Sequence, residues 1–91
     1  MKQPASNSWF VYILHCADGT LYTGITKDVT RRCQQHNAGT ASRYTRSRLP
    51  TKLLWHEPQA DQSSALKREA AIKSMTRSEK LQLIGLSKKS A

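Results

Sequence analysis

Residues 9–26 read WFVYILHCADGTLYTGIT, and this stretch carries the clearest structural pattern of the chain. It holds two runs of aromatic and β-branched residues, 9–15 and 21–26, joined by a segment that contains an Asp-Gly pair. Runs of this composition favour extended strands, and an Asp-Gly pair between two of them is a strong short-range hairpin signal. The stretch therefore predicts a β-hairpin.

The length of the hairpin loop determines which side chains share a face of the sheet. In a two-residue turn, His15 would pair with Tyr22, and Tyr12 would lie on the opposite face from Tyr22. In a three-residue loop with Gly19 in the left-handed position of a bulge, Leu14 pairs with Tyr22. Tyr12 and Tyr22 then share a face. We predict the three-residue loop.

A helix and a third strand are predicted after the hairpin. Thr26 or Asp28 can cap a helix that runs through Asn37. A basic loop rich in Ser and Thr comes next. Residues 51–57 then favour a strand, which we expect Pro58 to close because proline cannot donate a hydrogen bond to the ladder.

Two further helices are predicted in the C-terminal third. Asp61 or Ser63 can cap the first, and Thr76 with Glu79 forms a capping box for a last short helix through Leu86. The apolar side of the first of these helices is expected at Leu66, Ile72 and Met75, with Ala65, Ala70 and Ala71 packing close. The element order is then ββαβαα, which is typical of an α+β architecture.

Ninety-one residues make one domain, which we expect over residues 9–87 with a disordered N-terminus at 1–8 and a tail at 88–91. Hydrophobic residues are 37% of the chain, too many for a disordered protein. No apolar run approaches the roughly 18 residues that span a bilayer, and the polar N-terminus does not resemble a signal peptide. We therefore expect a cytoplasmic monomer with no membrane partner.

The two cysteines, Cys16 and Cys33, are too few for a disulfide framework. Cys33 stands three residues before His36, and His15 adjoins Cys16, which leaves a zinc site open. Neighbours on one strand point to opposite faces, however, so partly buried and unreactive cysteines are the favoured interpretation.

The charge points to a polyanionic partner. Fifteen Lys and Arg against six Asp and Glu give a net charge of +9, a balance typical of nucleic-acid-binding domains. The basic residues concentrate between 27 and 52, and arginine outnumbers lysine there. Arginine is well suited to bidentate contacts with phosphate. A solvated basic surface, or one that binds anionic lipid, is the simpler alternative. The candidates for contact with nucleic acid are Lys27, Arg31, Arg43, Arg46, Arg48 and Lys52.

With six acids, the chain favours chemistry built on one carboxylate. Hydrolysis of a phosphodiester needs an activated water, stabilisation of charge on the phosphoryl oxygens and, in most enzymes, a metal held by carboxylate. Asp18 is expected in the hairpin turn, and Asp28 and Asp61 near helix caps. The acids left for catalysis are Glu57, Glu69 and Glu79.

Five positions resemble the GIY-YIG endonuclease superfamily. Phe10-Val11-Tyr12 and Tyr22-Thr23-Gly24 look like its two paired motifs, and Arg32 stands ten residues beyond Tyr22, where the family carries a helix arginine. His36 follows one turn later, and Leu66-Lys67-Arg68-Glu69 puts a glutamate on a later helix, as the family does. Within the superfamily, the chain most resembles the small, stand-alone bacterial type. The resemblance implies a three-stranded antiparallel sheet flanked by helices.

The resemblance also implies roles for these side chains around a single phosphate. Tyr22 would help to activate the attacking water, directly or through His36, and Tyr12 would orient the water or a phosphate oxygen. Arg32 would hold the scissile phosphate, and Glu69 would bind Mg²⁺ or Mn²⁺. A shared site requires both tyrosines on one face, as the three-residue loop predicts.

Each residue also has an ordinary interpretation. The tyrosines can be packed strand residues with solvated hydroxyls, Arg32 a solvated helix arginine, and Glu69 the partner of Lys73 in an i,i+4 pair.

The chain also departs from the family pattern. The first motif has lost its glycine, and many family nucleases carry a late asparagine near the phosphate. The asparagines of this chain are Asn7 and Asn37, so that role would fall to another residue such as Lys80.

The resemblance therefore implies a small metal-dependent nuclease that hydrolyses DNA with low sequence specificity, in DNA repair or processing. A compact basic domain contacts the backbone rather than reading many base edges. The alternative is a GIY-YIG module that binds nucleic acid but cleaves weakly or not at all. An RNA-binding accessory protein would rest on charge alone, because the chain lacks an aromatic-rich RNA-binding motif.

Overall fold

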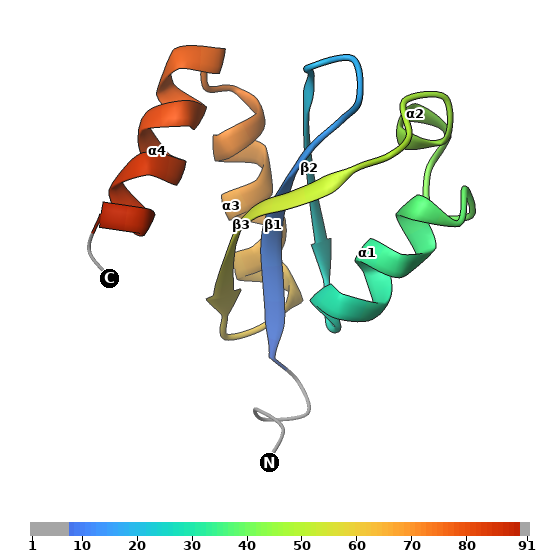
Figure 1. Ribbon diagram of the computed structural model, residues 1–91. Helices are drawn as coiled ribbons and strands as arrows, with labels where there is room; N and C mark the ends of the chain where they lie inside the picture. The colour runs from blue at the N-terminus through green and yellow to red at the C-terminus, as the bar shows by residue number, and fades with distance from the viewer. Residues whose placement is uncertain (1–7, 90–91) are drawn as a thin grey trace.

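A three-stranded antiparallel sheet forms the centre of the computed structural model, which describes residues 8–89 and their side chains from 8 to 85 (Figure 1). Strand β1 (Trp9–His15) lies between β2 (Leu21–Thr26) and β3 (Lys52–Gln59). The α+β class and the antiparallel sheet are as predicted. No helix of the described part is long and apolar enough to cross a bilayer.

The β1–β2 hairpin has the predicted three-residue loop. Leu14 pairs with Tyr22, and the Cys16 amide donates to the Thr20 carbonyl at 2.9 Å, which closes the loop. Gly19 has a φ of +87°, the left-handed conformation that a side chain would strain. Tyr12 and Tyr22 therefore lie on the same face of the sheet.

Strand β3 runs past the proline that we expected to end it. Pro58 lies inside the strand, opposite Phe10 of β1. The prediction that Pro58 closes the strand is wrong because β3 is an edge strand, paired on one side with β1. A proline without an amide hydrogen is tolerated at such an edge.

Between the hairpin and β3 lie helix α1 (Val29–Asn37) and a one-turn helix α2 (Arg43–Arg46). Asp28, one of the two predicted caps, accepts from the Arg31 amide at 3.0 Å and starts α1. The prediction of a plain loop before β3 missed α2, which begins where Ser42 Oγ accepts from the Thr45 amide at 3.1 Å.

Helices α3 (Gln62–Lys73) and α4 (Arg77–Lys89) complete the chain. Asp61 caps α3 in a capping box with Ser64. The predicted box of Thr76 and Glu79 starts α4: the Thr76 amide donates to Glu79 Oε1 at 2.8 Å, and the Glu79 amide donates to Thr76 Oγ1 at 3.1 Å. Helix α4 continues three residues beyond the predicted end at Leu86.

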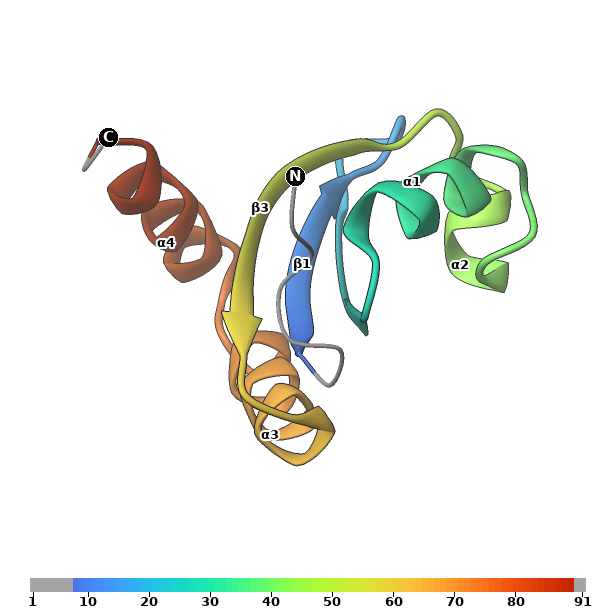
Figure 2. The ribbon, with the colours of Figure 1, turned by 90° about the horizontal axis from the view of Figure 1, so that it is seen from below.

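The helices cover the sheet from both sides (Figures 1 and 2). On one side, β1 and β3 pack against α3 and α4 around a buried cluster of Val11, Ile13, Trp55, Ala65, Ile72 and Ile84. On the other side, Tyr12 contacts α1. The predicted place of Leu66 on the apolar side of α3 is wrong: Leu66 is 48% exposed, because α3 turns Ala65 and Ile72, which were also predicted there, toward the sheet.

Candidate active site

Tyr12 lies at the centre of the face that α1 covers. It is the middle residue of β1, is 2% exposed and pairs with Gly24 of β2. A Cβ atom at Gly24 would lie 2.6 Å from the Tyr12 hydroxyl oxygen and 2.7 Å from Cζ. The second motif therefore needs glycine, because the Tyr12 ring occupies the space of the side chain.

A buried hydrogen-bond chain connects Tyr12 to both of the following helices. The Tyr12 hydroxyl lies 2.8 Å from His36 Nε2, and His36 Nδ1 lies 2.8 Å from Thr45 Oγ1. Thr45 Oγ1 is in turn 3.0 Å from Ser42 Oγ. The chain links β1, α1 and α2, and both ring nitrogens of His36 have partners.

The buried chain favours uncharged groups. Burial, and after it the neighbouring Tyr22, raises the pKa of Tyr12 far above that of a free phenol, although Arg32 opposes the shift. Burial, and after it the Arg32 guanidinium, lowers the pKa of His36 below 6.5. At pH 7 a neutral phenol therefore bonds a neutral imidazole, which offers one donor and one acceptor. The chain must run in a single direction.

Tyr22 joins this group through its ring. The ring centroid of Tyr22 lies 5.2 Å from that of His36 and 6.4 Å from that of Tyr12. Its other neighbour is Tyr44 of α2, stacked at 5.8 Å, whose ring is covered by the Arg48 guanidinium at 3.9 Å. Tyr22 is only partly buried, so of the two motif phenols it is the one that solvent reaches.

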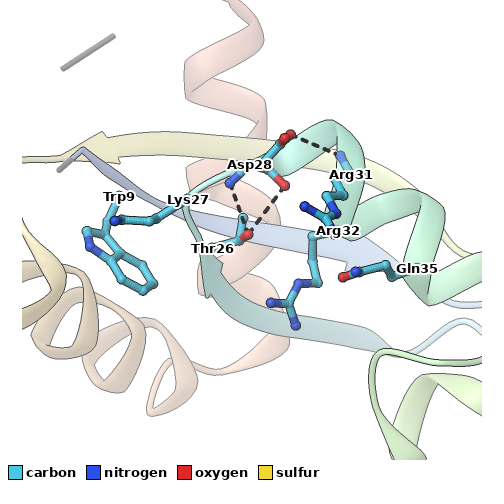
Figure 3. Close-up of a pocket in the computed structure, with 7 residues that line it drawn as sticks. All are labelled: Trp9, Thr26, Lys27, Asp28, Arg31, Arg32 and Gln35. Atoms are coloured by element: carbon cyan, nitrogen blue, oxygen red, sulfur yellow. Dashed lines mark hydrogen bonds between the residues drawn. The ribbon is translucent and has the colours of Figure 1, made fainter. Parts of the chain in front are cut away.

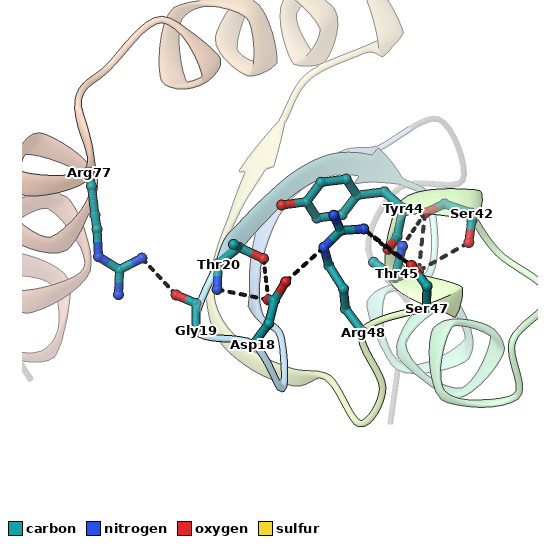
Figure 4. A network of polar contacts seen from close by, with 9 residues as sticks. All are labelled: Asp18, Gly19, Thr20, Ser42, Tyr44, Thr45, Ser47, Arg48 and Arg77. Atoms are coloured by element: carbon teal, nitrogen blue, oxygen red, sulfur yellow. Dashed lines mark hydrogen bonds and ion pairs between the residues drawn. The ribbon is translucent and has the colours of Figure 1, made fainter.

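Arg48 fastens the α2 segment to the hairpin (Figure 4). Its Nε donates to Asp18 Oδ2 at 2.8 Å, and its Nη1 donates to the Tyr44 carbonyl oxygen at 2.8 Å. Asp18 in turn accepts from the amide and the hydroxyl of Thr20. The predicted DNA contact at Arg48 is thus engaged within the protein, whereas Arg43 and Arg46 are exposed.

Arg32 has a buried nitrogen that nothing in the described part of the chain satisfies. Its Nε lacks a hydrogen-bond partner, and a buried donor left unpaired costs free energy. The guanidinium affects the pKa of both Tyr12 and His36, so it lies within their electrostatic range. It also lines a hollow of about 260 Å³ at the start of α1 (Figure 3). An anion in this hollow would find an unpaired donor.

Glu69 is connected to the cluster more loosely. It lies on α3, which packs against β1 and β2 from the other side of the sheet, and its carboxylate is ion-paired with Lys73 at 3.4 Å. This pair is the ordinary surface feature that the sequence also allowed. The carboxylate nevertheless contributes to raising the pKa of Tyr12, so its field reaches that phenol. The Glu69 side chain is 18% exposed.

The other carboxylates have structural partners. Glu57 is ion-paired with Arg68 at 2.9 Å, and Asp18, Asp28, Asp61 and Glu79 hold the turn and the helix starts described above. Among the described residues, no three of His, Cys, Asp and Glu lie close enough together to hold a metal ion. Cys16 is buried and Cys33 partly buried, and both are free. Most of the acids therefore serve the fold itself.

The structure thus brings Tyr12, Tyr22, Arg32 and His36 together and leaves Glu69 at the border of the group. Sequence reasoning missed Thr45, which holds the far side of His36, and Tyr44, which supports Tyr22. A weak signal existed for Tyr44, the one aromatic residue between 39 and 50.

Asn37 has a structural role at the end of α1. Its side chain accepts from the Thr51 amide at 2.7 Å and donates to the Thr51 carbonyl oxygen at 3.1 Å. These bonds tie the helix to the start of β3. The amide is therefore engaged and does not supply a group to the tyrosine cluster.

Comparison of the sequence with known proteins finds a matching family. The model of the GIY-YIG catalytic domain matches residues 8–82. A UPF0213 protein of Desulfotalea psychrophila is 51% identical over 83 residues, which cover 90% of this chain and 76% of that protein. A UPF0213 protein of Staphylococcus aureus is 50% identical over 78 residues, covering 86% of this chain and 95% of the relative.

Two solution structures have the same fold. A UPF0213 protein of Bacillus halodurans matches with a TM-score of 0.57 and 39% identity, over 87% of this chain and 84% of that one. A protein of E. faecalis matches with a TM-score of 0.61 and 36% identity, over 94% and 90% of the two chains. The three-stranded sheet with its helices is therefore shared with these small proteins.

Proposed function

The chain belongs to the GIY-YIG catalytic-domain family, and on that premise we propose that it is a metal-dependent nuclease that hydrolyses DNA phosphodiester bonds with low sequence specificity. Membership of this nuclease-type family implies a nucleic-acid substrate. The choice of DNA as substrate and the role in DNA repair or processing rest on similarity of fold. Similarity of fold supports a function less strongly than the geometry of a functional site does.

The observation that carries the proposal is the unpaired, buried Nε of Arg32 beside the tyrosines and His36. A guanidinium with an unpaired donor favours binding of an oxyanion, because the anion would satisfy that donor. The attraction between the two opposite charges is also stronger in a buried site of low dielectric constant than in water. The scissile phosphate is the anion that a nuclease must hold at this place. Arg32 would stabilise the charge that develops on its oxygens.

The two phenols would differ in role. Tyr12 is 2% exposed, bonded to His36 and held neutral by its raised pKa, so we assign it to positioning rather than to proton removal. Tyr22 is partly exposed and can meet an incoming water, which it would help to activate. His36 would keep Tyr12 in place, since its second nitrogen is anchored on Thr45.

Glu69 is the residue that would hold a divalent cation. Mg²⁺ is commonly bound through one or two carboxylates together with waters and substrate phosphate, so a single glutamate fits this ion better than it fits zinc. When bound, the ion would supply positive charge to the phosphate and lower the pKa of a bound water. Glu69 would have to release Lys73 to take part.

Cleavage of supercoiled, linear and single-stranded DNA, with and without Mg²⁺, tests the proposal. The variants are Arg32→Ala and Glu69→Gln, which should each lower the cleavage rate by roughly 100-fold or more, as loss of a charge-stabilising group does in other enzymes. Glu79→Gln is the matched control, because glutamine preserves the capping box while removing the same charge. This control should cut DNA at the wild-type rate.

Full activity of Arg32→Ala or Glu69→Gln would reject the site, and metal-independent cleavage would reject the assignment of Glu69. The alternative, a module that binds without cutting, is favoured by one observation: Asn37 is engaged with Thr51 and cannot replace the family's late asparagine. DNA binding that weakens with salt, without cleavage under any of these conditions, would support that alternative.

A further inference from the structure

The hollow at the start of α1 has two chemically different ends. Figure 3 shows the Trp9 ring with Lys27 at one end and Arg32 with Gln35 at the other. Arg31 stands on the same helix turn as Arg32. An aromatic surface on one side and guanidinium groups on the other match the two parts of a nucleotide, its base and its phosphate.

The charge of the hollow favours an anion. Three cations, Lys27, Arg31 and Arg32, line it against one carboxylate, that of Asp28. The Asp28 carboxylate is already engaged as the cap of α1, where it accepts from the Arg31 amide at 3.0 Å. The Arg32 Nε is buried and has no hydrogen-bond partner among the described residues. A phosphate at this end would therefore gain charge-assisted hydrogen bonds.

The aromatic end is a fixed surface rather than a mobile side chain. Trp9 is partly buried and packs against the core cluster. The Lys27 ammonium lies 5.7 Å from the ring centroid, a cation–π distance. Tryptophan held in this way beside a basic groove is the kind of surface on which nucleobases stack without regard to sequence.

We propose that this hollow binds the nucleotide next to the scissile phosphate, with its phosphate at Arg31 and Arg32 and its base against Trp9. The inference rests on the proposed function for the neighbouring scissile phosphate, because Arg32 belongs to both sites. A volume of about 260 Å³ lies just below the usual range of small-molecule sites and suits one nucleotide rather than a longer segment. Binding in the hollow would increase the affinity for the substrate without adding sequence specificity.

Titration of the full chain with thymidine 3′,5′-bisphosphate, in the absence of metal, tests the proposal by the NMR shift of the Trp9 indole N–H. Inorganic phosphate and thymidine serve as the two partial ligands. The bisphosphate should bind roughly tenfold more tightly than phosphate, since a stacked base contributes about that factor or more. The signal of Trp9 should move and that of the buried Trp55 should not.

Three variants separate the two ends. In isothermal titration calorimetry, which does not depend on the Trp9 indole, Trp9→Leu should reduce the affinity for the bisphosphate about tenfold, to that for phosphate, while Trp9→Phe keeps an aromatic face and part of the gain. Arg31→Ala should weaken both phosphate ligands. Lys67→Ala removes an equal charge from α3, outside the hollow, and should leave binding at Trp9 unchanged.

Equal binding by wild type and Trp9→Leu, or a shift confined to Trp55, would overturn the proposal. Its failure is distinguishable from that of the nuclease assignment. If the bisphosphate binds as expected but DNA is not cut, the nucleotide site stands and the nuclease fails. If DNA is cut while the Trp9 signal stays unmoved, the reverse holds.

Discussion

Gly24 and Tyr12 are opposite each other in the β1–β2 ladder, and each determines what the other can be. The Tyr12 ring lies over the glycine and reaches His36 at 2.8 Å only because no side chain intervenes. The glycine of the second motif is thus explained by a close approach, with no need for an unusual backbone conformation. The pairing of β1 with β2 is regular through Gly24, so the strand has no bulge there.

Gly24→Ala should displace the Tyr12 ring and break its bond to His36. We expect a loss of about 1–3 kcal/mol in the free energy of unfolding, as for other overpacked sites, together with at least roughly tenfold slower DNA cleavage. Urea denaturation and the cleavage assay measure the two effects.

Gly85→Ala is the matched control for that substitution. A Cβ at Gly85 of α4 would meet nothing within 4 Å, so the helix should gain about 0.5–1 kcal/mol in the free energy of unfolding. If Gly24→Ala is as stable and as active as this control, the close approach to Tyr12 has no consequence.

His36 should make the stability of the protein depend on pH. Its pKa is lowered in the folded state by burial and by Arg32, so protonation favours the unfolded chain. The contribution of neutral His36 to the free energy of unfolding is full above about pH 6.5, the ordinary pKa of histidine. It is lost as the pH falls through the lower pKa that His36 has in the folded state. The melting temperature should therefore drop on acidification from about pH 7.5 to about 5.5.

His36→Gln removes the titrating ring and should flatten this part of the pH profile of the melting temperature. His15 and His56 remain in that variant as exposed histidines and serve as an internal control. The same slope in wild type and His36→Gln would show that the buried imidazole is not the source of the pH dependence.

At the scale of elements, the one-turn helix α2 has an influence out of proportion to its four residues. It supplies Thr45 to His36 and Tyr44 to Tyr22, and the adjoining Arg48 bonds Asp18 of the hairpin loop. A second bond to the same loop comes from the start of α4, where the Arg77 side chain donates to the Gly19 carbonyl at 2.7 Å. Several elements thus hold the hairpin that carries both motif tyrosines.

Tyr44→Ala should lower cleavage about tenfold by freeing the Tyr22 ring, a positioning effect of modest size. Tyr44 is 38% exposed, so the cost in stability should stay near about 1 kcal/mol, in the range of one aromatic pair. Tyr44→Phe keeps the stack and should behave as wild type. Single-turnover rates and denaturation curves separate the two effects, and equal rates for alanine and phenylalanine would refute the role.

For the whole molecule, the two sides of the sheet have different roles: one holds the hydrophobic core and the other the candidate active site. Helices α3 and α4 lie on one side of the sheet and α1 and α2 on the other (Figure 2). The first side holds the apolar cluster, whereas on the second side His36 of α1 and Tyr44 of α2 meet the strand tyrosines Tyr12 and Tyr22. Binding of nucleic acid is therefore expected on the side of α1 and α2, through backbone phosphates.

The salt dependence of DNA binding tests this division. Replacing Arg43 and Arg46 with alanine should lower the slope of log K against log salt by about 2, roughly 1 for each phosphate that the protein no longer neutralises. Lys67→Ala removes an exposed charge from α3 and should leave the slope unchanged. Equal slopes for all variants would mean that α2 does not bind the backbone.

The sequence alone determined the features that depend on neighbouring residues. The hairpin register and the box at Thr76 follow from turn and cap chemistry over three or four residues. The caps were narrowed to two candidates each, of which Asp28 and Asp61 are the ones that the structure has. The spacing of five residues also sufficed to indicate the family. Hydrogen bonds of turns and caps form between residues close together in the chain, so the sequence alone is enough to predict them.

How distant segments of the chain meet is visible in the three-dimensional structure but not in the sequence. The bond of Tyr12 to His36 spans 24 positions, that of Arg48 to Asp18 spans 30, and Pro58 is tolerated because β3 lies at an edge. The same packing exposes Leu66 and leaves the Nε of Arg32 buried without a partner in the described part of the chain. Burial and pairing at long range depend on which faces come together, and no local pattern contains that information.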